Sequence, residues 1–256
     1  MKIKKYILEI VVFFCGFTVM TFELVGSRIL GPYFGTSIFV WTSLMGIILG
    51  SLSLGYYLGG KIADKKSSVS ILSLIIFLAA LTILLTYITK DLVLSFFQNY
   101  ILGIRTASVL ASIFLFFPTS VLLGIVSPYT VKLKLNNINL SGSTVGNLSA
   151  ISTTGSIVGT FLAGFYLIPN FGTNKLLIIL SSIVFLISIL LATKEYIKYK
   201  IYFTLFVFVI FIFINYILPN KDKLNMIDVD TTYNRIWIYD YRSEERRVGK
   251  ECRSRW

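Results

Sequence analysis

The stretch VSILSLIIFLAALTILLTYIT, residues 69–89, decides the fold class of this chain. None of its side chains carries a charge, and apolar residues occupy most positions. About 20 predominantly apolar residues are enough for a helix to cross the hydrocarbon core of a bilayer. The stretch therefore predicts a transmembrane helix.

The rest of the chain has the same apolar character. Of its 256 residues, 55% are hydrophobic, and the mean hydropathy is +0.79. The same length criterion predicts seven transmembrane helices in a membrane domain of residues 1–218. They are expected at residues 6–27, 38–58, 69–89, 106–126, 146–168, 175–193 and 201–218. The predicted fold class is an all-α polytopic membrane protein, with the lipid bilayer as its main partner.

The charged residues indicate how the chain is oriented. The formal net charge of +12 is divided among short clusters between apolar runs, which argues against a nucleic-acid-binding face. One set of predicted loops contains most of the lysines, namely Lys2, Lys4, Lys5, Lys61, Lys65, Lys66, Lys132, Lys134, Lys194, Lys198 and Lys200. The other set contains only Arg28, Lys90, Arg105 and Lys175. By the positive-inside rule, we expect a multi-pass protein of the plasma (inner) membrane with a cytoplasmic N-terminus.

Small residues recur at four-residue steps in two of the predicted helices. The second helix contains the pairs Gly46/Gly50 and Gly55/Gly59, and the fifth contains Gly155, Gly159 and Ala163. Such spacing lets helix backbones approach closely, so we expect these residues to pack helices together. A wall of small residues along a substrate path is the alternative interpretation.

Glu23 and Arg28 are the ionisable residues near the end of the first predicted helix. Five residues correspond to about 140° of rotation around a helix, so the two side chains are expected on different faces. Two interpretations of Glu23 stay open: a structural pair or cap that holds the following loop, and a proton or cation site in a transport path. Arg28 is expected to extend to the membrane interface.

Three further features have structural interpretations. Asp64, in the predicted cytoplasmic loop after the second helix, is expected to pair with Lys61 or with a helix end. Pro118 and Pro128 are expected to kink or end the fourth helix, because proline lacks the amide donor. The chain has two cysteines and no histidine, so neither a metal site nor Ser-His or Cys-His catalysis is predicted.

The composition changes after Pro219. The segment KDKLNMIDVDTTYNRIWIYDY, residues 221–241, becomes alternating in its second half, which predicts one strand of a soluble domain. We expect residues 219–241 to begin a soluble α/β domain that is truncated. The tail RSEERRVGKECRSRW, residues 242–256, resembles the in-frame translation of a sequencing-adapter oligonucleotide. It is interpreted as a cloning or assembly scar that does not belong to the native fold. The alternative is a native basic tail that binds anionic lipid.

Four ordered blocks carry a resemblance to a known family. They are ELVGSRILGPYFGTS (23–37), VWTSLMGIILGSLSLGYYLGGKIADK (40–65), PTSVLLGIVSPYTVKL (118–133) and AISTTGSIVGTFLAGFYLIPNFGT (150–173). Together they resemble the membrane domain of fused, transporter-like spermidine synthases. The segment DTTYNRIWIYDY (230–241) resembles the opening strand of the aminopropyltransferase domain of that family. The loop LGYYLGGKIADKKSS (54–68) is similar to the loop between the second and third helices of major facilitator transporters.

This resemblance implies an activity for full-length relatives. They are expected to transfer an aminopropyl group from decarboxylated S-adenosylmethionine, the cosubstrate, to putrescine, without a metal. It implies a substrate-binding role for Asp230, Tyr233 and Asn234, with an ordinary exposed strand surface as the alternative interpretation. The catalytic residues are expected to be absent from this chain. No cofactor is therefore expected in the fragment.

Two functions follow as alternatives. In the first, the chain is the membrane half of an aminopropyltransferase-like protein and is catalytically silent by itself. In the second, the helices form a transporter or binding module for a polyamine or another cation, with Glu23 as the coupling carboxylate. The predicted orientation with seven helices places residue 221 onward outside the cell, which conflicts with a cytosolic cosubstrate. No oligomeric state is predicted.

Overall fold

A computed structural model describes residues 6–101, 103–135 and 141–192, together with the backbone of residues 226–230 and 235–239. The helix expected at residues 201–218 and the tail at residues 242–256 lie outside these ranges. So do Tyr233 and Asn234.

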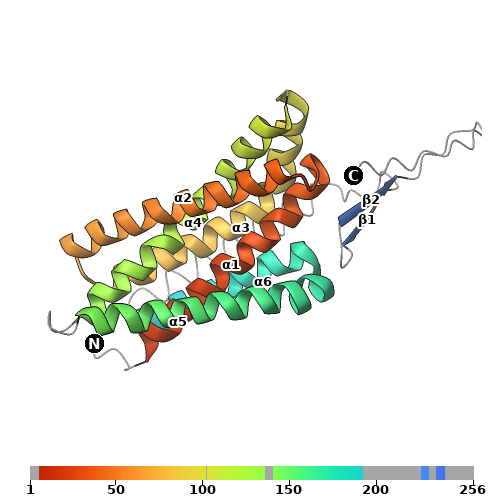
Figure 1. The fold of residues 1–256 in the computed structure, drawn as a ribbon. Coiled ribbons are helices and arrows are strands. Elements are labelled where there is room, and N and C mark those ends of the chain that lie inside the picture. The colour runs from red at the N-terminus through yellow and green to blue at the C-terminus, as the bar shows by residue number, and fades with distance from the viewer. Residues whose placement is uncertain (1–5, 102, 136–140, 193–225, 231–234, 240–256) are drawn as a thin grey trace, which may run out of the picture.

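The described part of the chain forms a bundle of long helices (Figure 1). In chain order they are α1 (Ile7–Phe34), α2 (Ile38–Lys65), α3 (Val69–Tyr100), α4 (Ile104–Lys134), α5 (Ser141–Leu162), the short π-helical turn η2 (Ala163–Leu167) and α6 (Ile168–Leu191). Among the described residues, five helical segments are long and apolar enough to cross a membrane: α1, α2, α3, α4 and the continuous segment Ser141–Leu191. This agrees with the predicted class, a multi-pass helical membrane protein.

The segment Ser141–Leu191 consists of two arms rather than one rod. Its 51 residues would extend roughly 75 Å as a straight helix, more than twice the thickness of the hydrocarbon core. Gly172 interrupts it with φ 71° and ψ 167°, a left-handed conformation that glycine adopts without a Cβ clash. Figure 1 shows α6 returning along the bundle after α5. The helices expected at 146–168 and 175–193 fall on these two arms.

Two pairs of parallel helices pack through glycines. A Cβ at Gly155 or Gly159 of α5 would collide with the backbone of Phe13 or Phe17 of α1. Because the two contacts follow in the same order on both helices, α1 and α5 run parallel. The expectation that small residues pack helices is therefore correct for α5.

The pair α2 and α4 is built in the same way. A Cβ at Gly59 would lie 2.7 Å from the carbonyl oxygen of Ile125, and one at Gly124 would lie 2.9 Å from that of Leu52. The other α2 pair, Gly46 and Gly50, has nothing within 4 Å of an added Cβ. Only one of the two glycine pairs in α2 is thus used for packing inside the bundle.

Hydroxyl groups join α3 to its antiparallel neighbours. Ser73 of α3 and Ser188 of α6 donate to each other's carbonyl oxygens, at 2.6 and 2.8 Å. Thr86 of α3 donates to the carbonyl oxygen of Leu115 in α4 at 2.8 Å. Lipid tails offer no hydrogen-bond partner. These bonds therefore give the buried hydroxyls the partners that they need in an apolar environment.

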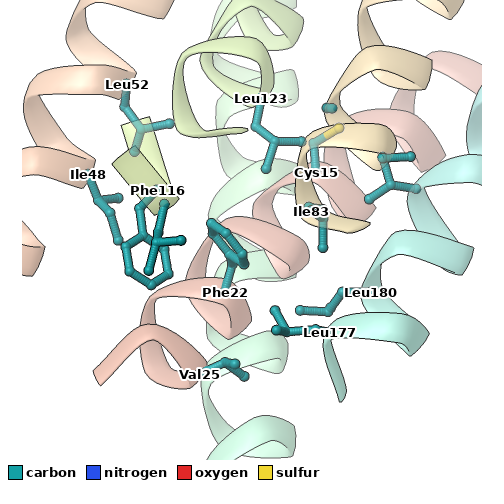
Figure 2. Packing of buried hydrophobic residues seen from close by; sticks show 14 of the residues in the cluster. Cys15, Phe22, Val25, Ile48, Leu52, Ile83, Phe116, Leu123, Leu177 and Leu180 are labelled. Carbon is teal, nitrogen blue, oxygen red and sulfur yellow. The ribbon is translucent and has the colours of Figure 1, made fainter. Parts of the chain in front are cut away.

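Apolar side chains fill the centre of the bundle. Phe22 of α1 and Phe116 of α4 are almost fully buried, and their ring centroids lie 5.1 Å apart in an edge-to-face arrangement. Figure 2 shows the two rings meeting beside Ile48 of α2. Gly26 of α1 also packs on Phe116, since a Cβ there would lie 2.9 Å from the ring. The absence of a side chain at Gly26 therefore leaves the space that the Phe116 ring occupies where α1 and α4 meet.

Two expectations need correction. Pro118 and Pro128 were expected to kink or end the fourth helix, and the second outcome is wrong, because α4 continues through both prolines to Lys134. Lys90, expected in a loop, lies inside α3 and is only 2% exposed. The helix α3 is longer than the predicted span because polar residues after residue 89 continue the helix beyond its apolar core.

Two short strands, β1 (Met226–Asp230) and β2 (Arg235–Tyr239), lie where one strand was expected. They pair antiparallel, with Asp228 opposite Trp237. A two-stranded ladder has no core of its own. The soluble α/β domain therefore stays a prediction.

Candidate functional site

A small cavity of about 60 Å³ lies where α1, α2, α4 and α5 come together. This volume has room for a few water molecules or one small solute group. The residues that border it are Val12, Cys15, Gly16, Val19, Leu52, Tyr56, Leu123, Val126, Ser127, Ser152 and Ser156. Cys15, Leu52 and Leu123 are labelled in Figure 2 and come from three different helices.

The polar groups of this cavity are neutral. The hydroxyl of Ser156 donates to the carbonyl oxygen of Gly16 at 3.2 Å, which leaves the Ser156 oxygen as an acceptor. Ser127, Ser152 and the phenol of Tyr56 add further hydroxyls. Hydroxyl and carbonyl oxygens are ligands for hard cations and acceptors for ammonium groups. No charged residue is among the described residues that border the cavity.

The tight α1–α5 contact creates this polar wall. Gly16 has no side chain, so Ser152 and Ser156 of α5 approach the α1 backbone closely. With any larger residue at position 16, a Cβ would collide with the carbonyl oxygen of Ser152. The same small-residue spacing that packs the helices therefore also positions the hydroxyls.

Glu23 extends the α1 face that borders the cavity. Val12, Gly16 and Val19 line it, and Glu23 follows at the next four-residue step, so the four residues share one side of the helix. Glu23 lies roughly 6 Å beyond Val19 along the helix axis. It is partly exposed, and its carboxylate forms no ion pair within the part of the chain that the structure describes.

Arg28 does not join this stripe. The helix α1 is continuous from Ile7 to Phe34 and does not unwind at Gly26, so Glu23 and Arg28 stay on different faces. The structure therefore does not bring these two residues together. Arg28 is partly exposed near the end of α1.

Asp64 lies at the end of the bundle that carries the N-terminus, and it has a different partner from the expected one. It accepts a hydrogen bond from Lys132 of α4 at 2.7 Å, with side chains 70% and 50% exposed. Lys61, the expected partner, places its ammonium 4.3 Å from the ring centroid of Tyr57 instead. Asp64 therefore links α2 to α4 and lies apart from the cavity.

A polar cluster at the opposite end of the bundle was not predicted. Lys90 and Asp91 form an ion pair at 3.0 Å, and the phenol of Tyr33 donates to Asp91 at 2.9 Å. The amide of Gln98 donates to the carbonyl oxygen of Tyr33 at 3.1 Å. The sequence feature that could have indicated this cluster is the adjacent lysine and aspartate at positions 90 and 91, because charged residues beside a transmembrane helix usually have partners.

The remaining candidates lie on the segment after the bundle. Asp230 is the last residue of β1 and is paired in register with Arg235. The structure describes only its backbone. Tyr233 and Asn234 lie outside the described residues. The substrate-binding role expected for these three residues stays a prediction.

Comparison of the chain with models of known protein families, with curated proteins and with solved structures gave no match. The resemblance to fused spermidine synthases and to major facilitator transporters thus stays a prediction from the sequence blocks.

Proposed function

We propose that the helical bundle is a membrane-embedded module that binds a small cation or amine between α1, α2, α4 and α5. The observation that carries this proposal is the stripe of α1 in which Glu23 follows the three residues that border the hydroxyl-lined cavity. A carboxylate that is partly buried in a membrane protein is costly unless a counter-charge or water reaches it. An amine or metal cation supplies such a counter-charge.

The cavity limits the size of the group that it can hold. About 60 Å³ accommodates an ammonium group with one or two methylenes, but no larger headgroup. One ammonium of a diamine would occupy the cavity beside the serine hydroxyls, and the rest of its chain would extend along α1 toward Glu23, which lies outside the cavity. Putrescine and spermidine are therefore the first ligands to test.

A second candidate function is the membrane half of an aminopropyltransferase-like protein in the plasma membrane. It is favoured by the position of the resembling blocks, which supply Gly55, Gly59 and Gly124 to the α2–α4 contact. Both candidates are compatible, because a module that binds polyamine would concentrate the product or substrate of such a transferase.

Binding of radiolabelled putrescine to the purified chain in detergent tests the first proposal. Glu23→Gln keeps the shape of the side chain and removes its charge, so we expect affinity to fall at least about tenfold. Asp64→Asn removes a carboxylate outside the cavity and is the matched control, expected to bind as the wild type does. Equal binding by the wild type and Glu23→Gln would refute the proposed site.

A further inference from the structure

A second, larger depression lies on the surface of the bundle, at the end opposite the N-terminus. It has a volume of about 590 Å³ and runs between the first three turns of α2 and the start of α4. It is bordered by Ile38, Phe39, Thr42, Ser43, Gly46, Ile47, Arg105 and Val109. Figure 1 shows α2 and α4 lying alongside each other.

The mouth of this groove is positively charged. Arg105 stands in the first turn of α4, with its guanidinium 4.2 Å from the ring centroid of Phe39. Neither residues 35–47 nor residues 103–112 contain an aspartate or glutamate. Within the described part of the chain Arg105 forms no ion pair. The groove therefore presents an uncompensated cation.

Two helix termini add to this potential. Ser43 of α2 and Ser108 of α4 are hydrogen-bonded at 3.1 Å, so the amino ends of these parallel helices lie side by side. The N-terminus of a helix carries roughly half a positive charge. An anion beside Arg105 would interact favourably with both helices.

The body of the groove is apolar. The hydroxyl hydrogens of Thr42 and Ser43 are used within α2, donated to the carbonyl oxygens of Ile38 and Phe39 at 2.8 and 2.7 Å. These hydroxyls therefore offer a ligand only acceptor oxygens, which do not bind an anion. Gly46 keeps the floor open, since nothing lies within 4 Å of an added Cβ.

We propose that this groove binds an anionic phospholipid, with its phosphate at Arg105 and one acyl chain along Gly46 and Ile47. A phospholipid has the two parts that the groove requires, an acceptor headgroup and an apolar tail, and it is present wherever the bundle is embedded. In a lipid whose headgroup carries no ammonium, the phosphate charge is not balanced within the headgroup, so its attraction to Arg105 is stronger than that of a zwitterionic lipid. The site therefore selects phosphatidylglycerol over phosphatidylcholine.

Native mass spectrometry of the purified full chain tests this selectivity, after exchange into micelles doped with equal amounts of phosphatidylglycerol and phosphatidylcholine. The wild type is expected to retain phosphatidylglycerol preferentially. Arg105→Gln is expected to reduce that retention about fivefold, the contribution typical of one basic residue near an anionic lipid surface. Lys175→Gln removes another exposed cation, three residues after Gly172 in α6, and is expected to leave retention unchanged.

A second pair of variants tests the apolar part. Gly46→Leu fills the groove without touching the packed helices, and it is expected to reduce phosphatidylglycerol retention about tenfold because the acyl chain is excluded. Gly50→Leu is the matched control, since Gly50 is equally open but does not border the groove. Unchanged retention in Arg105→Gln or Gly46→Leu, or equal retention of both lipids by the wild type, would overturn the proposal.

Discussion

Glu9 of α1 accepts a hydrogen bond from the ammonium of Lys134 of α4, with an oxygen-to-nitrogen distance of 2.6 Å. The two side chains are 17% and 26% exposed, so this ion pair is largely screened from water. It joins the first turn of α1 to the last turn of α4. The neighbouring pair Asp64–Lys132 joins α2 to α4 but is mostly solvent-exposed.

Glu9→Gln is expected to destabilise the bundle more than Asp64→Asn. The first change leaves Lys134 partly buried without its counter-charge, which we expect to cost about 1–2 kcal/mol of unfolding free energy. This is less than the loss of a fully buried ion pair, because both side chains are partly exposed. The second removes an exposed pair and is expected to cost less than about 1 kcal/mol. Unfolding by sodium dodecyl sulfate in mixed micelles measures both, and equal losses would contradict the ranking.

Gly155→Ala is expected to weaken the contact between α1 and α5. The new Cβ would collide with the backbone of Phe13, and the helices would have to separate, at a cost of about 1–3 kcal/mol. Gly146→Ala, on the same helix but with open space around the position, is the control. It is expected to be neutral or to stabilise the protein by up to about 1 kcal/mol, since alanine favours helix over glycine. Thermal unfolding in detergent distinguishes the two.

Two buried threonines at the α3–α4 interface are expected to respond differently to valine. Thr86→Val loses the hydrogen bond to the carbonyl oxygen of Leu115 and is expected to cost about 1 kcal/mol. Thr119 is fully buried, and its hydroxyl has no hydrogen-bond partner among the described residues. Thr119→Val is therefore expected to be neutral or stabilising. A larger loss for Thr119→Val, by thermal unfolding, would mean that its hydroxyl has a partner.

Asp91→Asn is expected to be among the most harmful conservative changes in the bundle. Lys90 is only 2% exposed and its ammonium lies 3.0 Å from Asp91, so removal of that carboxylate charge weakens an ion pair that is buried on the lysine side, at a cost of about 3 kcal/mol. Tyr33→Phe removes the hydrogen bond to Asp91 and keeps its charge, and it is expected to cost about 1 kcal/mol. Both are measured by the yield of monodisperse protein and its unfolding midpoint. The reverse order would show that Lys90 does not depend on Asp91.

The helical part of the fold was predictable because lipid imposes a simple requirement on sequence. A chain in hydrocarbon must satisfy its backbone within each segment, so long uncharged runs become helices regardless of their neighbours. The run at 69–89 therefore indicated α3 correctly. The end of α3 was not predictable in the same way, because Lys90 and Asp91 interrupt the uncharged run while the helix continues to Tyr100, where Asp91 and Gln98 are hydrogen-bonded to Tyr33 of α1.

The candidate site was only partly predictable. The sequence singled out Glu23 as an intramembrane carboxylate, but it did not indicate the serines of α5 that lie across from Gly16. Their position depends on which face of α5 meets α1, and small-residue spacing alone does not specify a partner helix. The partner of Asp64 was missed for the same reason, since Lys132 is 68 residues away along the chain.

What the sequence alone determined was the class of protein and the approximate positions of its helices. The length of an apolar run is a local property, and it decides by itself whether a helix can cross the bilayer. The tertiary structure decided which glycine pair of α2 is packed and which stays open, how Ser141–Leu191 turns back at Gly172, and which helix faces enclose the cavity beside Glu23. Those properties depend on contacts between residues far apart in the chain, where side-chain shape and not hydrophobicity selects the partner.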